Sequence, residues 1–263
     1  MVNNFLMAGK LGDFLHAMYA VKHLTKLHNT KAHIHLYDIG WELGIETAHR
    51  ELSDIMMRQD YVESVSILTD YDIGTEHNSP IKIYNKQLLD EGFCDLGNYI
   101  RSPWLYKVCW TELYSNTFNF PIGEEYAWIQ HNKINESLKD MVLIHRRFNP
   151  VRINSMFPYE QIVSTYKNRM VFVSSSEKDY EQFPHKNSVP FFKVSLVDDW
   201  FTAINSCAMF ISNLSSPAAM AHSLDKLRVI ELPNTIDIMH CIGEEKYSNN
   251  IGWYVNDNLN NLQ

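Results

Sequence analysis

The feature that most constrains the fold of this chain is a regular alternation between short apolar runs and longer segments of helical periodicity. Residues 5–8, 32–37 and 62–68 are apolar runs of strand length. The first two are followed by segments 14–27 and 45–59, whose apolar residues recur at the spacing of a buried helix face. Strand, helix, strand, helix, strand is the order typical of a parallel sheet with crossover helices.

The alternation restarts at Met141 after a less regular segment, in which we expect a strand at 81–84 and a helix at 103–114. The strands expected in the second half are residues 141–145, 170–173, 191–194, 209–211 and 228–232, and the helices are residues 158–166, 177–183, 197–205 and 217–224. We therefore predict an α/β fold of two Rossmann-like α/β/α halves, residues 1–135 and 136–263. In such folds ligands bind at the carboxyl ends of the strands, so we expect the two halves to face each other across a shared cleft.

The composition limits the classes of partner. The chain has 263 residues, with 23 basic and 31 acidic side chains and a formal net charge of −8. Because binding to a nucleic-acid backbone needs an excess of Lys and Arg, this charge argues against a nucleic-acid partner but allows a small basic pocket for one anion. The four cysteines are far apart and form no C-x-x-C pair, so we expect reduced thiols and neither a disulfide framework nor a metal site.

No segment of the sequence predicts export or membrane insertion. The first residues lack a basic segment followed by a long apolar stretch. No run of about 18 apolar residues occurs, which is the length that a membrane-spanning helix needs. We therefore expect a cytoplasmic protein without a transmembrane segment, for which peripheral contact with a membrane remains open.

The turn after the first expected strand reads Gly9-Lys10-Leu11-Gly12-Asp13. It is neither a Walker A loop nor a G-x-G-x-x-G motif. Because glycine lets the backbone approach a ligand and a helix start favours anions, Lys10 and Gly12 are candidates for an acceptor- or phosphate-binding loop. Asp13 has two interpretations. It is either an acid that stabilises the first turn of the helix, or a carboxylate that takes a proton from a sugar hydroxyl.

The strand expected at 141–145 ends in three residues that can carry positive charge. They are His145, Arg146 and Arg147. Arginine presents a fork of donors that matches phosphate oxygens, so these residues are candidates for binding the diphosphate of a nucleotide donor. The alternatives are a solvated strand end and, for His145, a histidine that is satisfied within the fold.

Two further strands end in small polar residues. The strand expected at 209–211 is followed by Asn213, Ser215 and Ser216, and hydroxyl and backbone N–H groups at the start of the next helix fit a phosphate. Ser174 and Ser175 form a weaker version of the same arrangement. We assign all five residues to donor binding, with simple helix capping as the alternative.

Three segments in order along the chain resemble the bacterial heptosyltransferases, the ADP-heptose transferases of lipopolysaccharide synthesis. They are residues 12–18 (GDFLHAM), 143–146 (LIHR) and 210–221 (FISNLSSPAAMA). The resemblance implies a GT-B fold and an inverting, metal-independent glycosyltransferase that needs no cofactor. Its donor would be a nucleotide-diphosphate sugar, and its acceptor a glycan or another hydroxyl compound. By position, Asp13 would be the catalytic base, and Ser215 and Ser216 would lie beside the donor diphosphate.

The chain departs from the pattern of this family at three positions of the third segment. Leu214 stands where the family has Asp, Ser216 where it has Gly, and Ala219 where it has His. These departures leave the donor sugar and its base open. They also motivate an alternative, a non-catalytic nucleotide- or sugar-binding protein of the same fold. The strand end at His145 is similar to that of fucosyltransferases that use GDP-fucose.

Overall fold

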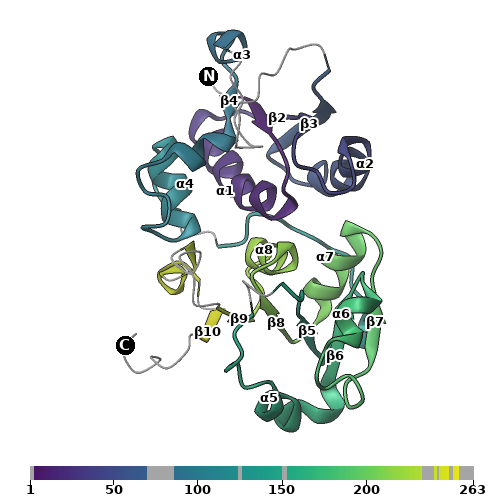
Figure 1. The fold of residues 1–263 in the computed structure, drawn as a ribbon. Coiled ribbons are helices and arrows are strands. Elements are labelled where there is room, and N and C mark those ends of the chain that lie inside the picture. The colour runs from purple at the N-terminus through teal and green to yellow at the C-terminus, as the bar shows by residue number, and fades with distance from the viewer. Residues whose placement is uncertain are drawn as a thin grey trace. The chain divides into compact units, whose positions relative to one another are not determined.

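The chain folds into two compact units, each with its own parallel sheet (Figure 1). A computed structural model describes residues 3–69, 86–123, 126–149, 153–232, 240–241, 243–248 and 251–254. The units are Met1–Gln130 and His131–Gln263. The strand expected at 81–84 lies outside the described residues.

The first unit contains four parallel strands in the order β3-β2-β1-β4. They are β1 (Asn4–Met7), β2 (Ala32–Leu36), β3 (Val62–Ile67) and β4 (Cys94–Asp95). The first three are the strands expected from the apolar runs. The fourth has two residues, too few to produce a periodic pattern.

The helices of the first unit follow these strands. They are α1 (Leu11–His28), α2 (Ile45–Met56), α3 (Lys86–Asp90), η1 (Leu96–Arg101) and α4 (Trp110–Phe118). The helix expected at 103–114 begins only at Trp110. Tyr106 has a φ of 58°, outside the helical region, and this interrupts the run.

The second unit contains a six-stranded sheet in the order β10-β9-β8-β5-β6-β7, with all neighbouring strands parallel. The strands are β5 (Val142–His145), β6 (Met170–Ser174), β7 (Phe191–Lys193), β8 (Met209–Asn213), β9 (Arg228–Glu231) and β10 (Ile251–Tyr254). The helices are η2 (Glu136–Leu138), α5 (Tyr159–Tyr166), η4 (Lys167–Arg169), α6 (Glu177–Glu181), α7 (Val197–Ser206), α8 (Ser216–Ser223) and η6 (Glu244–Lys246). Every strand predicted in this half is present, and β10 is an addition.

Apolar side chains of these elements form the cores. In the first unit α1 is buried over most of its length, including Phe14, Leu15 and Met18. A large buried cluster of the second unit joins the sheet to α5 and the turn after α6, and consists of Val142, Ile144, Phe157, Tyr159, Val163, Met170, Phe172, Phe183, Val189 and Ile211. Burial of these faces is what removes apolar surface from water and stabilises each unit.

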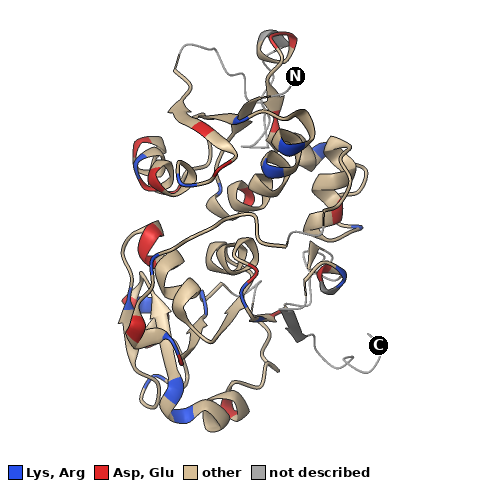
Figure 2. Cartoon of the chain, turned by 180° about the vertical axis from the view of Figure 1, so that it is seen from behind, with Lys and Arg blue, Asp and Glu red and all other residues tan. Residues whose placement is uncertain are grey.

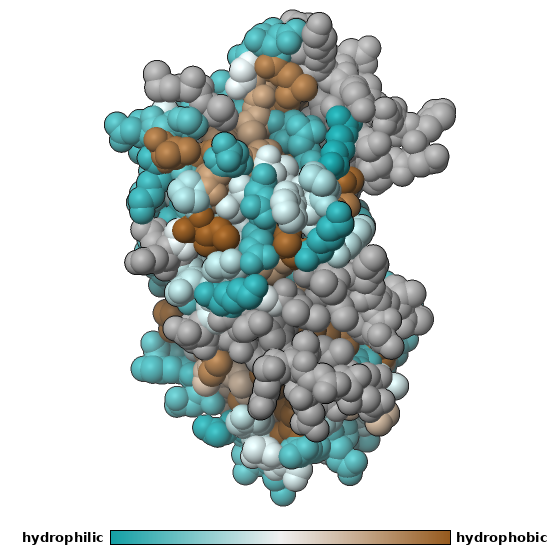
Figure 3. Space-filling model, turned by 90° about the vertical axis from the view of Figure 1, so that its left-hand side faces the viewer, coloured by the Kyte–Doolittle hydropathy of each residue, from teal (hydrophilic) through white to brown (hydrophobic). Residues whose placement is uncertain are grey.

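The described surface carries charges of both signs. Figure 2 shows Lys and Arg interspersed with Asp and Glu on both units. On the face drawn in Figure 3, the apolar side chains that are described form small separate patches among polar ones. Within the described part of the chain, no helix combines the length and the apolar character needed to cross a bilayer.

Candidate functional site

Each sheet has a point where the winding of the chain reverses. In the first unit β1 lies between β2 and β4, and in the second β5 lies between β6 and β8. Parallel α/β sheets bind ligands outside the carboxyl ends of the strands at such switch points. Of the predicted site residues, all but Ser174 and Ser175 stand at the carboxyl end of β1, β5 or β8.

Asp13 lies in the first turn of α1, directly after β1. Its side chain is half-buried at the end of the helix where free N–H groups favour a negative charge. Lys10 is exposed at the N-cap position and does not cap the helix with its side chain, and Gly12 forms part of the same turn. The three predicted residues of this loop therefore lie at the N-cap or in the first turn of α1.

Two tyrosines from other elements lie beside Asp13. Tyr99, in η1, lies close enough to Asp13 for the charge of that carboxylate to act on the tyrosine hydroxyl. The hydroxyl of Tyr114, in α4, donates to the backbone carbonyl oxygen of Asp13 at 3.3 Å. Burial, followed by the nearby Asp13 charge, raises the pKa of Tyr99 well above its usual range, so this hydroxyl stays protonated.

Gly9 is required by a backbone contact within the fold. Its N–H donates to the carbonyl oxygen of Ile39 at 2.8 Å. A Cβ at Gly9 would overlap the carbonyl oxygen of Gly40, and Gly40 itself has a φ of 78°, which favours glycine. The close backbone approach that this glycine allows is therefore made to the loop after β2.

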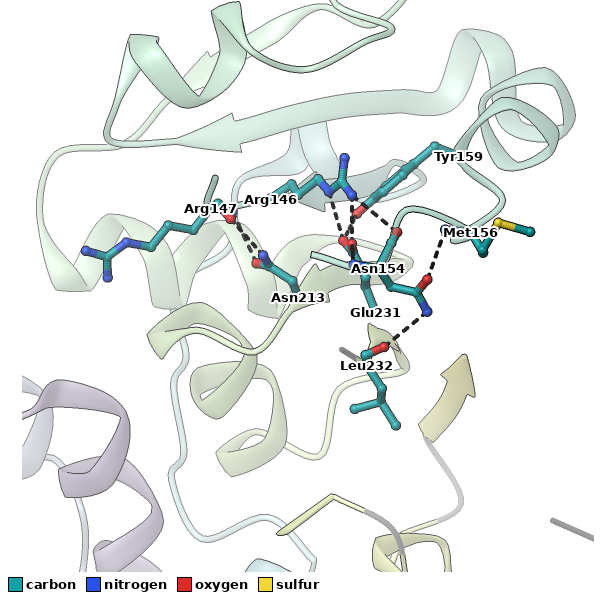
Figure 4. A network of polar contacts seen from close by, with 8 residues as sticks. All are labelled: Arg146, Arg147, Asn154, Met156, Tyr159, Asn213, Glu231 and Leu232. Carbon is teal, nitrogen blue, oxygen red and sulfur yellow. Dashed lines mark hydrogen bonds and ion pairs between the residues drawn. The ribbon is translucent and has the colours of Figure 1, made fainter. Parts of the chain in front are cut away.

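Asn213, the last residue of β8, bonds to the loop that follows β5. These strands are hydrogen-bonded neighbours, with His145 opposite Ser212. The fully buried Asn213 side chain accepts from the Arg147 N–H at 3.1 Å and donates to the Arg147 carbonyl oxygen at 2.8 Å. It thereby fixes the backbone at Arg147, whose exposed side chain points away from this joint (Figure 4).

Ser215 and Ser216 stand at the start of α8 and are half-buried. Ser215 occupies the N-cap position, but its hydroxyl donates to the carbonyl oxygen of Asn213 at 3.1 Å instead of accepting from the helix. It therefore leaves the N–H groups of the first turn to other partners. Leu214, at the position of the family's Asp, packs against an apolar cluster that includes Ala218 and Ile230.

Arg146 is buried in an ion pair with Glu231, at the end of β9. Its Nε and Nη2 donate to the two carboxylate oxygens at 3.0 and 2.8 Å. The Tyr159 hydroxyl and the Asn154 N–H also donate to Glu231, each at 2.7 Å (Figure 4). Two of the donors that we expected to face a diphosphate are thus engaged within the fold.

His145 has the environment of a histidine that is satisfied within the fold. Its Nδ1 lies 3.0 Å from the carbonyl oxygen of Val173, so this nitrogen carries the proton and donates. The ring packs edge-on against Trp200, with centroids 5.0 Å apart. Burial lowers the pKa of His145 to about 4, so the side chain is neutral at pH 7.

Ser174 and Ser175 follow β6, the strand next to β5. The buried Ser174 hydroxyl accepts from the Ser176 N–H at 3.1 Å and donates to Asp179 at 3.3 Å. This shapes the turn before α6. Ser175 is exposed and lies beyond the end of the strand.

The sequence reasoning missed three functional candidates. Tyr99 and Tyr114 carry no local signal, because only the packing of η1 and α4 brings them to α1. Glu231 had a usable signal, since it is a charged residue at the end of an apolar strand, the same pattern that singled out Arg146.

The sequence matches no protein-family model and no curated protein. Several solved structures are similar in fold. Escherichia coli heptosyltransferase WaaC, solved with ADP, aligns over 96% of this chain and 92% of its own, with a TM-score of 0.59 and 11% identity. E. coli ADP-heptose lipopolysaccharide heptosyltransferase II aligns over 96% and 90%, with a TM-score of 0.55 and 10% identity.

A third similar structure is TibC, an iron-containing dodecameric glycosyltransferase of enterotoxigenic E. coli. It aligns over 87% of this chain and 57% of its own, with a TM-score of 0.59 and 13% identity. At these identities the similarity concerns the fold. The chain therefore has the α/β fold of the heptosyltransferases, the fold that its three resembling segments led us to expect.

Proposed function

We propose that this chain is a glycosyltransferase that transfers a sugar from a nucleoside-diphosphate sugar to a hydroxyl group of a glycan-like acceptor. One observation carries the proposal. The heptosyltransferase fold is combined with a carboxylate at the switch point of one sheet and with cationic and N–H groups at the switch point of the other. Because both must act on one anomeric carbon, the proposal includes two halves that face each other across a cleft.

Asp13 is the proposed base of the acceptor side. Its carboxylate takes the proton of the acceptor hydroxyl as the oxygen attacks the anomeric carbon of the donor. The bond from that carbon to the diphosphate oxygen breaks, and its electron pair leaves with the nucleoside diphosphate. A single displacement of this kind inverts the configuration at the anomeric carbon.

The carboxyl edge of the second sheet is the proposed donor side. Negative charge builds up on the diphosphate as it leaves, and preorganised donors stabilise such charge. The exposed Arg147 side chain and the first N–H groups of α8 are suited to this task. The proposal needs no metal ion, so turnover is expected to persist in EDTA.

ADP is the first nucleotide to test, because WaaC was solved with ADP and TibC with ADP-D-β-D-heptose. A thermal-shift screen of the full chain with ADP, GDP, UDP and CMP reports binding. A ligand at 100 times its Kd stabilises the fold by about 2.7 kcal/mol. A shift with one nucleoside diphosphate supports the donor site, and no shift with any of them contradicts it.

Asp13→Asn separates an enzyme from a non-catalytic binding protein. The variant should bind the nucleotide as the parent does, yet transfer or hydrolyse the donor sugar about 10²- to 10⁴-fold more slowly. If the parent binds but neither transfers nor hydrolyses any donor sugar, the binding-protein alternative holds. If the parent turns over and Asp13→Asn is equally active, the base assignment is wrong.

A further inference from the structure

We propose that Asn213 is a positioning residue for Arg147. It holds the Arg147 backbone at a fixed place relative to the start of α8 and does not itself touch the nucleotide. The inference rests on the proposed function, in which Arg147 and the first N–H groups of α8 bind the diphosphate. It replaces the donor contact that the sequence motif suggests for Asn213 with an effect transmitted through a neighbouring residue.

The first line of argument is the pair of hydrogen bonds between the Asn213 side chain and the Arg147 backbone. Oδ1 accepts from the Arg147 N–H at 3.1 Å, and Nδ2 donates to the Arg147 carbonyl oxygen at 2.8 Å (Figure 4). An amide that uses its acceptor and its donor on one residue fixes the orientation of that residue as well as its place. Asn213 therefore sets the direction in which the exposed Arg147 side chain leaves the strand end.

The second line of argument is burial. Asn213 is 0% exposed and ends β8, which has hydrogen-bonded neighbours on both sides in β5 and β9. A side chain without accessible surface does not contact a ligand at the edge of the sheet. An effect of this side chain on nucleotide binding therefore passes through the residue to which it bonds.

The third line of argument is that Asn213 is itself anchored to the other part of the donor edge. Its backbone carbonyl oxygen accepts from the hydroxyl of Ser215, the N-cap residue of α8, at 3.1 Å. One residue thus links the loop after β5 to the start of α8. Donors that are held in place before an anion arrives bind it better than mobile ones, so this link favours diphosphate binding.

Asn154 provides a matched control. It is 3% exposed, and its side chain also joins two backbone groups. It accepts from the Met156 N–H at 2.9 Å and donates to the Leu232 carbonyl oxygen at 3.1 Å. Asn154→Ala therefore removes a buried amide of the same kind, whose partners lie in the loop before α5 and directly after β9.

The experiment measures the Kd of ADP for the full chain by calorimetric titration, in a double-mutant cycle. Asn213→Ala should weaken binding about 10-fold, because Arg147 no longer presents its charge-assisted bond in place. In the Arg147→Ala background the same change should cost about 2-fold or less, because the group that Asn213 positions is already absent. Asn154→Ala should bind ADP as the parent does.

Asn213→Ser takes the place of Asn213→Ala if the alanine variant does not fold. Serine is neutral and polar, but its hydroxyl is too short to bond both backbone groups of Arg147, so the same two results are expected.

Two results would overturn the inference while leaving the donor site in place. One is an equal loss of affinity with and without the Arg147 side chain, which would mean that Asn213 acts on the nucleotide independently. The other is a loss in Asn154→Ala as large as in Asn213→Ala, which would mean a general loosening of the second unit. If Arg147→Ala weakens ADP binding and Asn213→Ala does not, the inference again fails alone. If the parent binds no nucleotide, the proposed function fails and the inference fails with it.

Discussion

At the residue scale, the surroundings of a polar side chain decide its role more than its type does. Arg146 and Arg147 are neighbours of the same kind at one strand end. Arg146 is buried against the fully buried Glu231, whereas Arg147 is exposed and its backbone bonds to Asn213. The sequence motif could not separate the two, because Glu231 reaches Arg146 only through the pairing of β8 with β5 and β9.

Glu231→Gln should destabilise the chain severely. The change leaves the buried Arg146 charge without its counter-charge, which typically costs about 3–5 kcal/mol. Glu181→Gln is the matched control, because Glu181 pairs with Lys186 in an exposed position, where such pairs contribute about 1 kcal/mol or less. Urea denaturation at pH 7 measures both variants, and equal losses would contradict the argument.

His145 should make the fold sensitive to acid. Its pKa of about 4 in the fold lies below the usual 6.5, so between these pH values only the unfolded chain takes up the proton. Stability therefore falls as the pH drops through this window, by up to about 3 kcal/mol from this one group. The free energy of unfolding, measured by denaturation at pH 7.5 and 4.5, should differ less between the two pH values in His145→Gln than in the parent. An unchanged difference would contradict the lowered pKa of His145.

At the element scale, the two ends of the second sheet should differ in what they bind. The carboxyl ends of β5 and β8 carry Arg147 and the start of α8, and the amino end of β6 carries the exposed Arg169 in η4. Helix starts and arginine side chains favour phosphate, and the switch point places them at one edge. Both arginines are exposed, so exposure alone does not distinguish the two edges. The carboxyl edge is assigned to the donor because the switch point lies there.

Arg147→Ala should weaken the binding of a nucleoside diphosphate by about 1.5–3 kcal/mol, which is the range for a hydrogen bond to a charged group. Arg169→Ala removes the same charge from the other edge and should bind as the parent does. Calorimetric titration measures both. Equal affinities in the two variants would show that Arg147 is not part of the donor site.

At the scale of the whole molecule, the units have separate sheets and cores, so a nucleotide is expected to stabilise one of them directly. Hydrogen exchange with ADP should slow in peptides that cover 142–149 and 209–217, while peptides of β1, β2 and β3 keep their rates. The Arg147→Ala variant should lose this protection at the same ADP concentration. If hydrogen exchange slows only in the first unit, the assignment of the donor to the second sheet is wrong.

The success of sequence reasoning also depends on scale. The long apolar runs predicted β1 to β3 and β5 to β9, because a buried parallel strand needs such a run. The two-residue β4 and the helix start at Trp110 were missed, since one is too short for a pattern and the other follows the left-handed Tyr106. Strand ends located the candidate residues, but their partners come from distant segments and are set by packing.

The buried pair of Arg146 and Glu231 has a consequence for how this sequence can change over generations. Either residue alone cannot be replaced without leaving an uncompensated charge in the core, whereas a well-packed apolar pair of similar volume can be neutral or stabilising. The two positions are therefore epistatic. Viable substitutions at 146 and 231 must arrive together, and a library that varies them one at a time will recover only the parent pair.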